Sequence, residues 1–469
     1  MNVAFLFGIM FVVFSVVGTA IAWVARRVGL RSIEDFYAAV GRFGGFLAAM
    51  TYAATTYSSF MLVGLVGLAY ATGVGSLGFE LAYLLATIGI LCLWGPRVWK
   101  LARCRGFVSP SELLSRLYNS RLLGLFVSLL YLVALIPYVS AQFIGVGRVF
   151  EGLGLGFATG VGAMLVLSIV WTVLAGMWSV ATTDAFQGMW MITTSFGLLV
   201  WLVGLTSGGN VDVGEVLEKY GLLSVGGGFW SPAIFVSFTI PWMFFAITNP
   251  QVVQRLYTPR NSKAYRQMVL MFAVYGLAFT AFVVYIGLVA RALADYHLIP
   301  LPRTRDQVTP CLLTVAPPML AAATYVGIVA ASLSTVDSIV LSIASALVRE
   351  VGRGKMLAYT SIVFVNFVAA SIASTKPAPI VEMSVLSSLL LLPLAPASIY
   401  AVYRPHEANN HRIAATASIL AGVIVAFAAA ILLGPRKTLT TLVAGIPVPL
   451  IVLTVSTIPI AVSIVYRRS

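Results

Sequence analysis

The apolar positions form long runs that are separated by short segments rich in charge, glycine or proline. A helix needs about 20 apolar residues to cross the hydrocarbon core of a bilayer, and thirteen runs come near that length. We therefore predict thirteen transmembrane helices, numbered zero to twelve, near residues 3–25, 44–70, 76–99, 122–149, 157–179, 183–206, 230–254, 267–292, 315–348, 356–374, 378–402, 411–433 and 446–466. The fold class that follows is an all-α polytopic membrane protein.

Composition supports the same fold class. Of the 469 residues, 60% are hydrophobic and 9% are charged, whereas about 25% of the residues in a soluble domain are charged. A soluble enzyme, a disordered chain and a nucleic-acid-binding protein are therefore excluded. The three cysteines and three histidines have no metal-ligand spacing, and the sequence contains no phosphate-binding loop. We expect no cofactor and no ATP hydrolysis.

The distribution of charge predicts the orientation of the chain. The net charge of +14 comes from 29 basic and 15 acidic residues. With the N-terminus outside, 21 of the 29 basic residues, Arg255 among them, fall in inward connections or in the C-terminal tail. This split follows the positive-inside rule. It predicts a multi-pass protein of the cell (plasma) membrane, with its N-terminus outside and its C-terminus cytoplasmic, whose partner is the lipid bilayer and not a nucleic acid.

Two of the predicted helices are interrupted by polar residues or proline. Span one contains a hydroxyl-rich stretch at 53–59, and span six contains Pro241 and the pair Asn249-Pro250. A broken helix is tolerated in a membrane where it lines a cavity or a binding site. The two breaks lie five spans apart, which is the pattern of an inverted-repeat secondary transporter. The alternative is that polar and proline-bearing helices serve packing alone.

Span eight carries a stripe of hydroxyl groups. The residues of the stripe recur at spacings of 4, 4 and 3, which places them on one helical face: Ser334, Ser338, Ser342 and Ser345. Thr335 and Asp337 flank the stripe, and a carboxylate inside a membrane usually faces a cavity, an ion or a partner. Hydroxyl and carbonyl oxygens are the hard ligands that a cation such as Na⁺ requires. The alternative is that the serines bond back to the preceding turn.

Four further acidic residues lie in or beside the predicted spans. Asp184 opens span five, where it suits a helix cap. Glu80 is the fifth residue of span two, which is too deep for a loop position. Glu382 lies near the outer end of span ten, where an interfacial charge is expected, and Glu151 is expected in an outer loop.

An ordered set of motifs resembles the sodium:solute symporter family. The motifs run from about Glu34 to Glu350 and read EDFYAAVGRFGGF, GLVGLAYATGVG, VSPSELLSRLY, LAGMWSVATTDAFQG and ASLSTVDS. The resemblance implies a transporter, not an enzyme, with an inverted five-plus-five helical core (LeuT-like) that couples inward Na⁺ movement to solute uptake. The single transmembrane domain, 1–469, would then divide into an extra N-terminal helix, two five-helix repeats and two C-terminal helices, at 3–25, 44–206, 230–402 and 411–466.

The resemblance also implies the position of a sodium site. The carbonyl ligands of the family fall on Ala54, Tyr57 and Ala331, and the hydroxyl ligands fall on Ser334 and Thr335. In span eight the spacings of three and four from the carbonyl residue to the two hydroxyl residues place all three on one helical face. The resemblance therefore agrees with the cation ligands expected from the residues themselves.

The two acidic residues near this site have roles that the resemblance implies. Asp184 matches an acidic residue that family members carry at the start of core helix five, where it is associated with sodium coupling or with the inward exit path. Asp337 is expected to line the same exit.

The resemblance to particular members narrows the solute. Glu80 matches a sugar-contacting residue of the galactose symporter, but span seven has no lysine, and Phe60 and Met61 stand where sugar carriers have an acid and an amide. Sugar is therefore disfavoured. The proline symporter matches at Tyr138, at Trp242 and at Pro250, and it departs at Thr56 and Ala246. The segment NPQVVQRLYTPRNSKAYRQ is more similar to the monocarboxylate and vitamin carriers.

Physical chemistry favours a small carboxylate. The half-helix that begins near Ser58 would present unpaired N–H groups and a positive dipole end. Tyr138 and Trp242 would cover an apolar body and offer an O–H and an N–H, although they also suit ordinary packing. The expected solute-binding residues are Thr56, Ser58, Glu80, Tyr138, Trp242 and Pro250.

The resulting hypothesis is a Na⁺-coupled importer of a small organic solute that bears a carboxylate. The solute would be a proline-like amino acid or a monocarboxylate such as pantothenate or acetate. A sodium/sugar symporter and a proton-coupled carrier are the alternatives within transport. A channel would need a continuous polar pore, for which the span-eight hydroxyl stripe is the candidate, and a membrane-embedded enzyme would need a catalytic pair that the sequence lacks.

Overall fold

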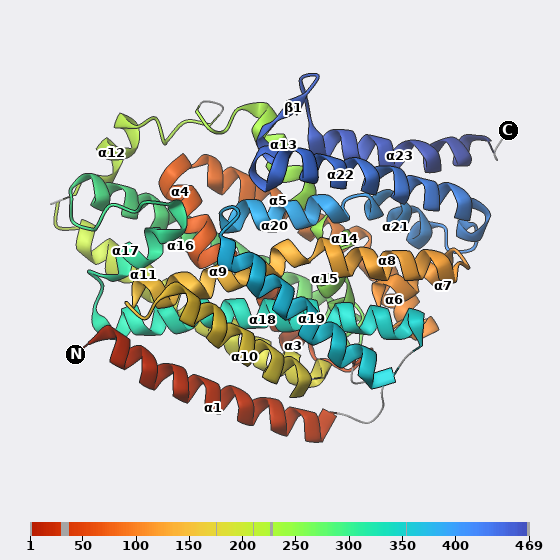
Figure 1. Ribbon diagram of the computed structural model, residues 1–469, viewed down its shortest axis with the longest axis horizontal. Coiled ribbons are helices and arrows are strands. Elements are labelled where there is room, and N and C mark those ends of the chain that lie inside the picture. The colour runs from red at the N-terminus through yellow and green to blue at the C-terminus, as the bar shows by residue number, and fades with distance from the viewer. Residues whose placement is uncertain are drawn as a thin grey trace.

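A computed structural model describes residues 2–29, 37–174, 176–209, 211–225, 228–352 and 354–466. Helices make up most of these ranges, and one short antiparallel pair is formed by β1 (Leu442–Val443) and β2 (Ile446–Pro447). In Figure 1 the N-terminal helix and the two C-terminal helices lie at opposite edges of the bundle.

The helices are named in chain order. The first part of the chain forms α1 (Val3–Gly29), α3 (Gly45–Thr56), η1 (Phe60–Leu65), α4 (Val66–Thr72), α5 (Gly75–Leu93), α6 (Gly95–Arg105), α7 (Pro110–Leu117), α8 (Arg121–Ala134), α9 (Ile136–Gly152), α10 (Phe157–Leu174), α11 (Met177–Thr206) and α12 (Val213–Lys219). The second part forms α13 (Pro232–Met243), α14 (Phe245–Thr248), α15 (Pro250–Arg255), α16 (Ser262–Asp295), η2 (Arg305–Gln307), α17 (Val308–Leu313), α18 (Pro318–Val351), α19 (Gly354–Thr375), α20 (Ile380–Leu391), α21 (Leu394–Tyr403), η3 (Ala408–His411), α22 (Arg412–Thr440) and α23 (Val448–Tyr466).

The described ranges contain ten helical segments that are long and apolar enough to cross a membrane, or twelve when two strongly bent pairs each count as one span. A shorter apolar helix covers Phe157–Val173. Each of the thirteen predicted ranges overlaps one of these segments. The multi-pass, all-α architecture is therefore confirmed.

The predicted break in span one is confirmed. Helix α3 ends at Thr56 and the chain resumes at Phe60 in the π-helical turn η1, with a bend of 51° between the two halves. Tyr57 has extended backbone angles (φ −93°, ψ 118°), so its peptide group leaves the helical path. The last carbonyls of α3 therefore lack the partners that a continuous helix would provide.

The predicted break in span six is confirmed at Asn249-Pro250 but not at Pro241, which lies inside α13. Single residues, Phe244 and Asn249, separate α13, α14 and α15. Asn249 has an extended backbone (φ −85°, ψ 116°) because a residue before proline is pushed out of the helical region. A third break was not predicted: α20 and α21 meet at a bend of 53°, where Pro393 follows a long run of leucines.

The predicted boundary between spans four and five is wrong. Span four was expected to reach residue 179 and span five to begin at 183, but α10 ends at Leu174 and α11 begins at Met177. The extended backbone of Gly176 (φ −118°, ψ −176°) precedes the new helix. Asp184 is therefore not the helix cap that its sequence position suggested, because it lies two turns inside α11.

Helix α18 forms the centre of the bundle. The membrane-spanning window of α18 is entirely buried, and α18 contacts α1, α3, α8, α9, α10, α11, α15 and α19. Its sequence is rich in alanine and serine, and small side chains let neighbouring membrane helices approach closely. The hydroxyl stripe of span eight is therefore placed among several helices and not toward lipid.

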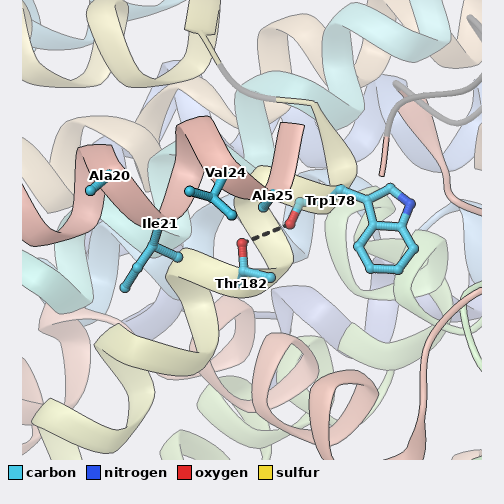
Figure 2. Close-up of a pocket in the computed structure, with 6 residues that line it drawn as sticks. All are labelled: Ala20, Ile21, Val24, Ala25, Trp178 and Thr182. Carbon is cyan, nitrogen blue, oxygen red and sulfur yellow. Dashed lines mark hydrogen bonds between the residues drawn. The ribbon is translucent and has the colours of Figure 1, made fainter. Parts of the chain in front are cut away.

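A surface groove lies between α1 and the beginning of α11 (Figure 2). Its volume is about 480 Å³, and its lining consists of Ala20, Ile21, Val24, Ala25, Trp178 and Thr182. The Thr182 hydroxyl donates a hydrogen bond to the Trp178 carbonyl at 2.9 Å. This groove involves none of the residues that the sequence assigns to sodium or solute.

Candidate functional site

At the break in span one, the end of α3 is hydrogen-bonded to one serine in the middle of α18. The hydroxyl of Ser334 lies 2.9 Å from the carbonyl oxygen of Ala54 and 3.0 Å from that of Ala331. The first carbonyl belongs to the last turn of α3, and the second belongs to the preceding turn of α18. Three of the five residues assigned to sodium are therefore brought together, with three oxygen atoms close to one another in the interior of the protein.

The two remaining sodium-assigned residues flank this cluster. Thr335 is fully buried, and its hydroxyl oxygen has no hydrogen-bond partner in the described structure. Such an orphan oxygen is unusual in a protein interior and fits a ligand for a cation. Tyr57 ends α3 at the break, but its ring turns away and stacks on Phe272 and Tyr275 of α16, with centroids 5.9 Å apart in both pairs. Only its backbone carbonyl is suited to the cation.

One helical turn below, a buried network surrounds Asp184. Its carboxylate accepts hydrogen bonds from Thr51 at 2.6 Å and from Thr55 at 3.4 Å, both from α3. Arg255 of α15 approaches the same oxygen at 3.5 Å and donates to the Ser338 hydroxyl of α18 at 2.6 Å. The network therefore joins α3, α11, α15 and α18, which include both interrupted spans.

The position of Arg255 differs from the one predicted from the sequence. It was counted among the basic residues of an inward connection, but it is fully buried. The reason is that Arg255 ends the short helix α15, which is still inside the bundle, and the buried carboxylate of Asp184 compensates its charge. The only sequence signal was an arginine directly after an apolar run that contains a break.

Asp337 does not join the Asp184 network. Its carboxylate accepts a hydrogen bond from Thr172 of α10 at 2.7 Å, whereas the neighbouring residue Ser338 bonds with Thr55 at 2.9 Å. Consecutive residues of a helix point about 100° apart, so Asp337 leaves α18 in a different direction from Ser338, although its carboxylate still interacts electrostatically with that of Asp184. The sequence assigned both acids to one exit path, and within the described hydrogen bonds they have separate partners.

The lower half of the hydroxyl stripe has a structural role. Ser342 and Ser345 donate to the carbonyls of Ile339 and Ser342 within α18, each at 2.8 Å. These bonds are the back-bonding that the sequence left open as an alternative. Ser345 also accepts a hydrogen bond from Gln254 of α15 at 3.1 Å. Ser334 bonds back to Ala331 as well, but Ser334 and Ser338 are the members of the stripe that also bond across to α3.

The solute-assigned aromatic residues meet in one cluster around Trp242. Its ring contacts Tyr138 at 6.2 Å, Tyr83 at 5.4 Å, Phe60 at 5.3 Å and Phe245 at 4.9 Å between centroids. These rings come from α9, α5, η1 and α14, and η1 begins the second half of the broken span one. The aromatic cluster therefore lies against both helix breaks.

The polar tips in and around this cluster are unpartnered. The hydroxyls of Tyr83 and Tyr138 and the indole N–H of Trp242 are buried without a hydrogen-bond partner in the described structure. Buried tyrosine and tryptophan usually find partners for these groups. Glu80 lies one turn before Tyr83 on α5, is also buried, and has one carboxylate oxygen unpartnered. The cluster thus offers three donors and, beside them, an acidic group.

The remaining solute-assigned residues differ in what they offer. Thr56 is buried and its hydroxyl has no partner in the described structure. Pro250 is buried at the first position of α15, where it has no N–H to offer. The next residue, Gln251, was not singled out from the sequence, yet both ends of its amide are buried and unpartnered.

The free N–H groups expected at the second half of span one are in fact satisfied. The backbone N–H of Phe60 donates to the Ser58 hydroxyl at 3.1 Å, and that of Ser59 donates to the side-chain carbonyl of Gln142 at 3.2 Å. The expectation failed because a side chain from another helix acts as the cap. The spacing of four residues from Tyr138 to Gln142 places both on one face of α9 and was the available signal.

Glu382 and Glu151, which the sequence placed near the outer surface, also differ from expectation. Glu382, expected as an interfacial charge, is buried and forms an ion pair with Arg305 of η2. The adjacent Asp306 accepts a hydrogen bond from the backbone N–H of Ile380 at 3.2 Å, at the start of α20, and burial raises the pKa of Asp306. Glu151 lies in the last turn of α9, not in a loop, and pairs with Arg148 at 2.5 Å. The segment η2 is therefore bound to the start of α20.

Comparison with known proteins places these features in a family. Residues 36–354 match the model of the sodium:solute symporter family, close to the limits expected from the motifs. A sodium/pantothenate symporter of Escherichia coli (strain K12) is 25% identical over 342 residues, which cover 71% of this chain and 69% of that protein. A sodium/pantothenate symporter of Haemophilus influenzae is 25% identical over 371 residues, with 75% and 72% covered.

Solved structures share the fold. A Na⁺-coupled sialic acid symporter in a substrate-bound, outward-open state superposes with a TM-score of 0.74 at 16% identity, covering 99% of this chain and 96% of that one. Mhp1, a nucleobase-cation-symport-1 family transporter, gives a TM-score of 0.57 at 14% identity, with 92% and 94% covered. The predicted fold class is confirmed, and the protein is a membrane symporter and not an enzyme. The chain belongs to the sodium:solute symporter family.

Proposed function

We propose that this protein couples the entry of Na⁺ to the uptake of a small solute that bears a carboxylate, by alternating access. The observation that carries the sodium part is the meeting of the Ala54 and Ala331 carbonyls at the Ser334 hydroxyl, at 2.9 and 3.0 Å. Two helices that belong to different halves of the proposed repeat supply these oxygens. A cation held there would draw the broken span one onto α18.

The chemistry of this oxygen cluster favours a metal cation over a proton. Its proposed members are carbonyls and hydroxyls: Ala54, Tyr57, Ala331, Ser334 and Thr335. None of these groups takes up or releases a proton near neutral pH, whereas neutral oxygen atoms are suitable ligands for a hard cation. The orphan hydroxyl of Thr335 would gain in the ion the partner that it lacks. In this proposal Na⁺ is cargo that crosses the membrane with the solute.

The Asp184 network is proposed to communicate the binding of the ion. Thr55 of this network is the neighbour of Ala54, and Thr55 bonds to Ser338, which lies one turn from Ser334. A shift of α3 relative to α18 would therefore change the hydrogen bonds that Asp184 and Arg255 make with these two helices. We assign sodium coupling to Asp184, and a place on the inward path to Asp337.

The carboxylate of the solute is supported by the donors around Trp242. The indole N–H and the hydroxyls of Tyr83 and Tyr138 are three buried donors without acceptors, and an ionised carboxylate offers two oxygens with acceptor sites only. Thr56, Ser58 and Pro250 at the two breaks are proposed to border the same solute. Pantothenate, the solute named for the two bacterial relatives, carries such a group and is the first candidate.

A proline-like amino acid is the second candidate, and one observation favours it. Glu80 is buried with an unpartnered carboxylate oxygen, beside aromatic rings that attract cations. A cationic amine on the solute would satisfy this oxygen. Competition between pantothenate and proline for uptake separates these two candidates.

The proposed orientation places the N-terminus outside and the C-terminus in the cytoplasm of the cell membrane. It rests on the distribution of basic residues along the chain and the positive-inside rule. The burial of Arg255 removes one residue from the inward set and leaves the asymmetry in place. Labelling of single cysteines introduced at exposed positions, such as His297 and Arg266, with a membrane-impermeant reagent tests it. We expect labelling from outside at position 297 and not at position 266.

The experiment that tests the proposed function is uptake into proteoliposomes. Purified protein is reconstituted, and accumulation of labelled pantothenate, pyruvate, proline and galactose is followed under an inward Na⁺ gradient. We expect uptake of one of the three carboxylates and none of galactose, with loss of uptake when K⁺ replaces Na⁺. Uptake that persists with K⁺ and follows an imposed pH gradient would support a proton-coupled carrier instead.

A further inference from the structure

One side chain from a third helix closes the break in span one. The Oε1 atom of Gln142 accepts hydrogen bonds from the backbone N–H of Ser59 at 3.2 Å and from its hydroxyl at 2.8 Å. The Nε2 atom of the same amide donates to the carbonyl of Tyr138 at 3.3 Å. Gln142 is fully buried on α9, so an amide from a distant helix occupies the position of an N-terminal cap.

This arrangement is unusual for a helix cap. Caps are normally supplied by a serine, threonine, aspartate or asparagine directly before the helix, and η1 has no such side-chain cap on its own residue Ser59. The Gln142 oxygen accepts two donors from one residue, which is how a carboxylate oxygen binds at the start of a helix. The amide therefore presents an acceptor where an anion would bind.

Helix α9 packs closely against Ser59, and both donors of Ser59 are already bound to the amide oxygen. A β-carbon placed on Gly145 of α9 would lie 2.6 Å from the Ser59 hydroxyl oxygen, so α9 presses directly on the break. Gly145 lies three residues after Gln142, and Tyr138 lies four residues before it, on the same helical face. An anion that reached Ser59 would therefore have to replace the Gln142 oxygen.

The aromatic cluster around Trp242 lies close to Ser59 and Gln142. The unpartnered hydroxyl of Tyr138 is on the ring that contacts Trp242 at 6.2 Å, and its backbone carbonyl holds the Gln142 amide. Phe60, directly after Ser59, contacts Trp242 at 5.3 Å. A carboxylate bound by the cluster would thus have Ser59 within the same neighbourhood.

We propose that Gln142 is an internal place-holder for one carboxylate oxygen of the solute. In the solute-free site its Oε1 satisfies the two donors of Ser59, and on binding the carboxylate takes both donors while the amide turns away. Gln142 is then a specificity-determining residue, because a solute without an acidic group cannot compensate the loss of two hydrogen bonds. This inference rests on the proposed carboxylate solute.

The place-holder role and a structural capping role predict opposite results. A structural cap tolerates glutamate, since a negative charge is favourable at a helix start, and its removal by alanine harms uptake. A place-holder competes with the solute, so its removal strengthens solute binding. Glutamate at this position would weaken solute binding, because its negative charge would bind the Ser59 donors and repel the carboxylate of the solute.

The test compares Gln142→Ala and Gln142→Glu with wild type in the reconstituted uptake assay, using the carboxylate that wild type transports. Gln267→Glu is the matched control, because it makes the same chemical change at an exposed position of α16. The readouts are KM and kcat for the carboxylate, and the shift of the melting temperature that the carboxylate causes in Na⁺. The corresponding alcohol, which lacks the carboxylate, is measured in parallel.

For Gln142→Ala we expect KM to fall about 3-fold to 10-fold, because the solute no longer competes with the amide, and this factor corresponds to one typical hydrogen bond. We also expect the solute to cause a larger shift of the melting temperature. For Gln142→Glu we expect a KM raised about 10-fold or more, since like charges placed together are strongly unfavourable. The control keeps the wild-type KM, and the alcohol gains no affinity from either variant.

Two results would overturn the inference while leaving the proposed function intact. One is a higher KM and smaller solute-induced melting shift for Gln142→Ala, which would make the amide a direct solute contact or a structural cap. The other is wild-type uptake by Gln142→Glu. If the wild-type protein takes up no carboxylate, that result contradicts the proposed function, and the proposed role of Gln142 is then contradicted as well.

Discussion

Asp184 and Arg255 form an ion pair in the interior of the protein, with 3.5 Å between Oδ2 and Nη2, and both side chains are buried. The pair joins α11 to the short helix α15 at the second break, and Thr51 and Ser338 bind the same two groups from α3 and α18. A charge buried without its partner costs much more than the pair contributes. The pair therefore stabilises one arrangement of the broken spans. A movement of either span would change the distance between the two charges.

The first prediction concerns this pair. Replacing Arg255 with glutamine leaves the carboxylate of Asp184 buried without its compensating charge, so we expect the free energy of unfolding to fall by about 3–5 kcal/mol. Uptake driven by Na⁺ should be lost as well. The double variant with Asp184→Asn removes both charges and should recover most of the stability without recovering Na⁺ dependence. Thermal melts of the purified variants measure the first effect. If the single and double variants are equally unstable, the two charges do not compensate each other.

The second prediction concerns the sodium ligands. Ser334→Ala and Thr335→Ala each remove one proposed ligand, and we expect the Na⁺ concentration for half-maximal uptake to rise about 10-fold, as for the loss of one bond to a charged group. Ser342→Ala is the matched control, because its hydroxyl bonds within its own helix at 2.8 Å. Titration of uptake with Na⁺ provides the measurement. An equal rise in all three variants would point to a general disturbance of α18.

The third prediction concerns the solute donors. Trp242→Phe keeps an aromatic ring but removes the indole N–H, so we expect KM for the carboxylate to rise by about 3-fold to 10-fold with the Na⁺ dependence unchanged. Trp230→Phe is the control, since that ring packs on Phe79 and Phe229 and not on Trp242, and its N–H is also unpartnered in the described structure. A greater effect of the control would place the solute outside the cluster around Trp242.

The fourth prediction concerns the contact between α4 and the segment η2. A β-carbon on Gly67 of α4 would overlap the backbone oxygen of Arg305 in η2, so alanine there forces the two segments apart. We expect Gly67→Ala to lower the free energy of unfolding by about 1–3 kcal/mol, the usual cost of overpacking. Gly89→Ala in α5 is the control, because nothing lies within 4 Å of the added atom, and alanine favours a helix. A stable Gly67→Ala variant would show that η2 separates from α4 without cost.

The sequence predicted the helical architecture because long apolar runs can form little else in a membrane. The break in α3 was visible as a cluster of hydroxyl residues between apolar ones, and the break at Asn249 was visible as a proline. The bend between α20 and α21 was missed although Pro393 stood in the apolar run. No polar residue accompanied that proline, and the sequence alone did not separate a packing kink from a break.

The candidate site was less predictable where it depends on residues far apart in the chain. Ser334 was found from its position on a helical face, and the structure brings it to Ala54. Arg255 and Glu382 were placed at the surface because the cost of burying a charge usually keeps it there. Their burial depends on Asp184 and Arg305, which lie 71 and 77 residues away in sequence, and such pairing is decided only by tertiary packing.

Gln142 shows the same limit for a neutral group. A single amide in an apolar run gives no sign of which donors it will meet. Only the fold places its oxygen at Ser59, on a helix 83 residues earlier. The expectation of free N–H groups at the break was reasonable for an isolated half-helix, and it failed because another helix filled the position.

We propose that Na⁺ bound between Ala54, Ala331, Ser334 and Thr335 drives solute uptake. The most direct measurement is the initial rate of labelled pantothenate uptake into proteoliposomes as the outside Na⁺ concentration is varied, for wild type and for Ser334→Ala. We expect saturable, Na⁺-dependent uptake by wild type and a curve displaced to higher Na⁺ in the variant. Uptake with the same rate in K⁺ as in Na⁺, or identical Na⁺ curves for the two proteins, would contradict it.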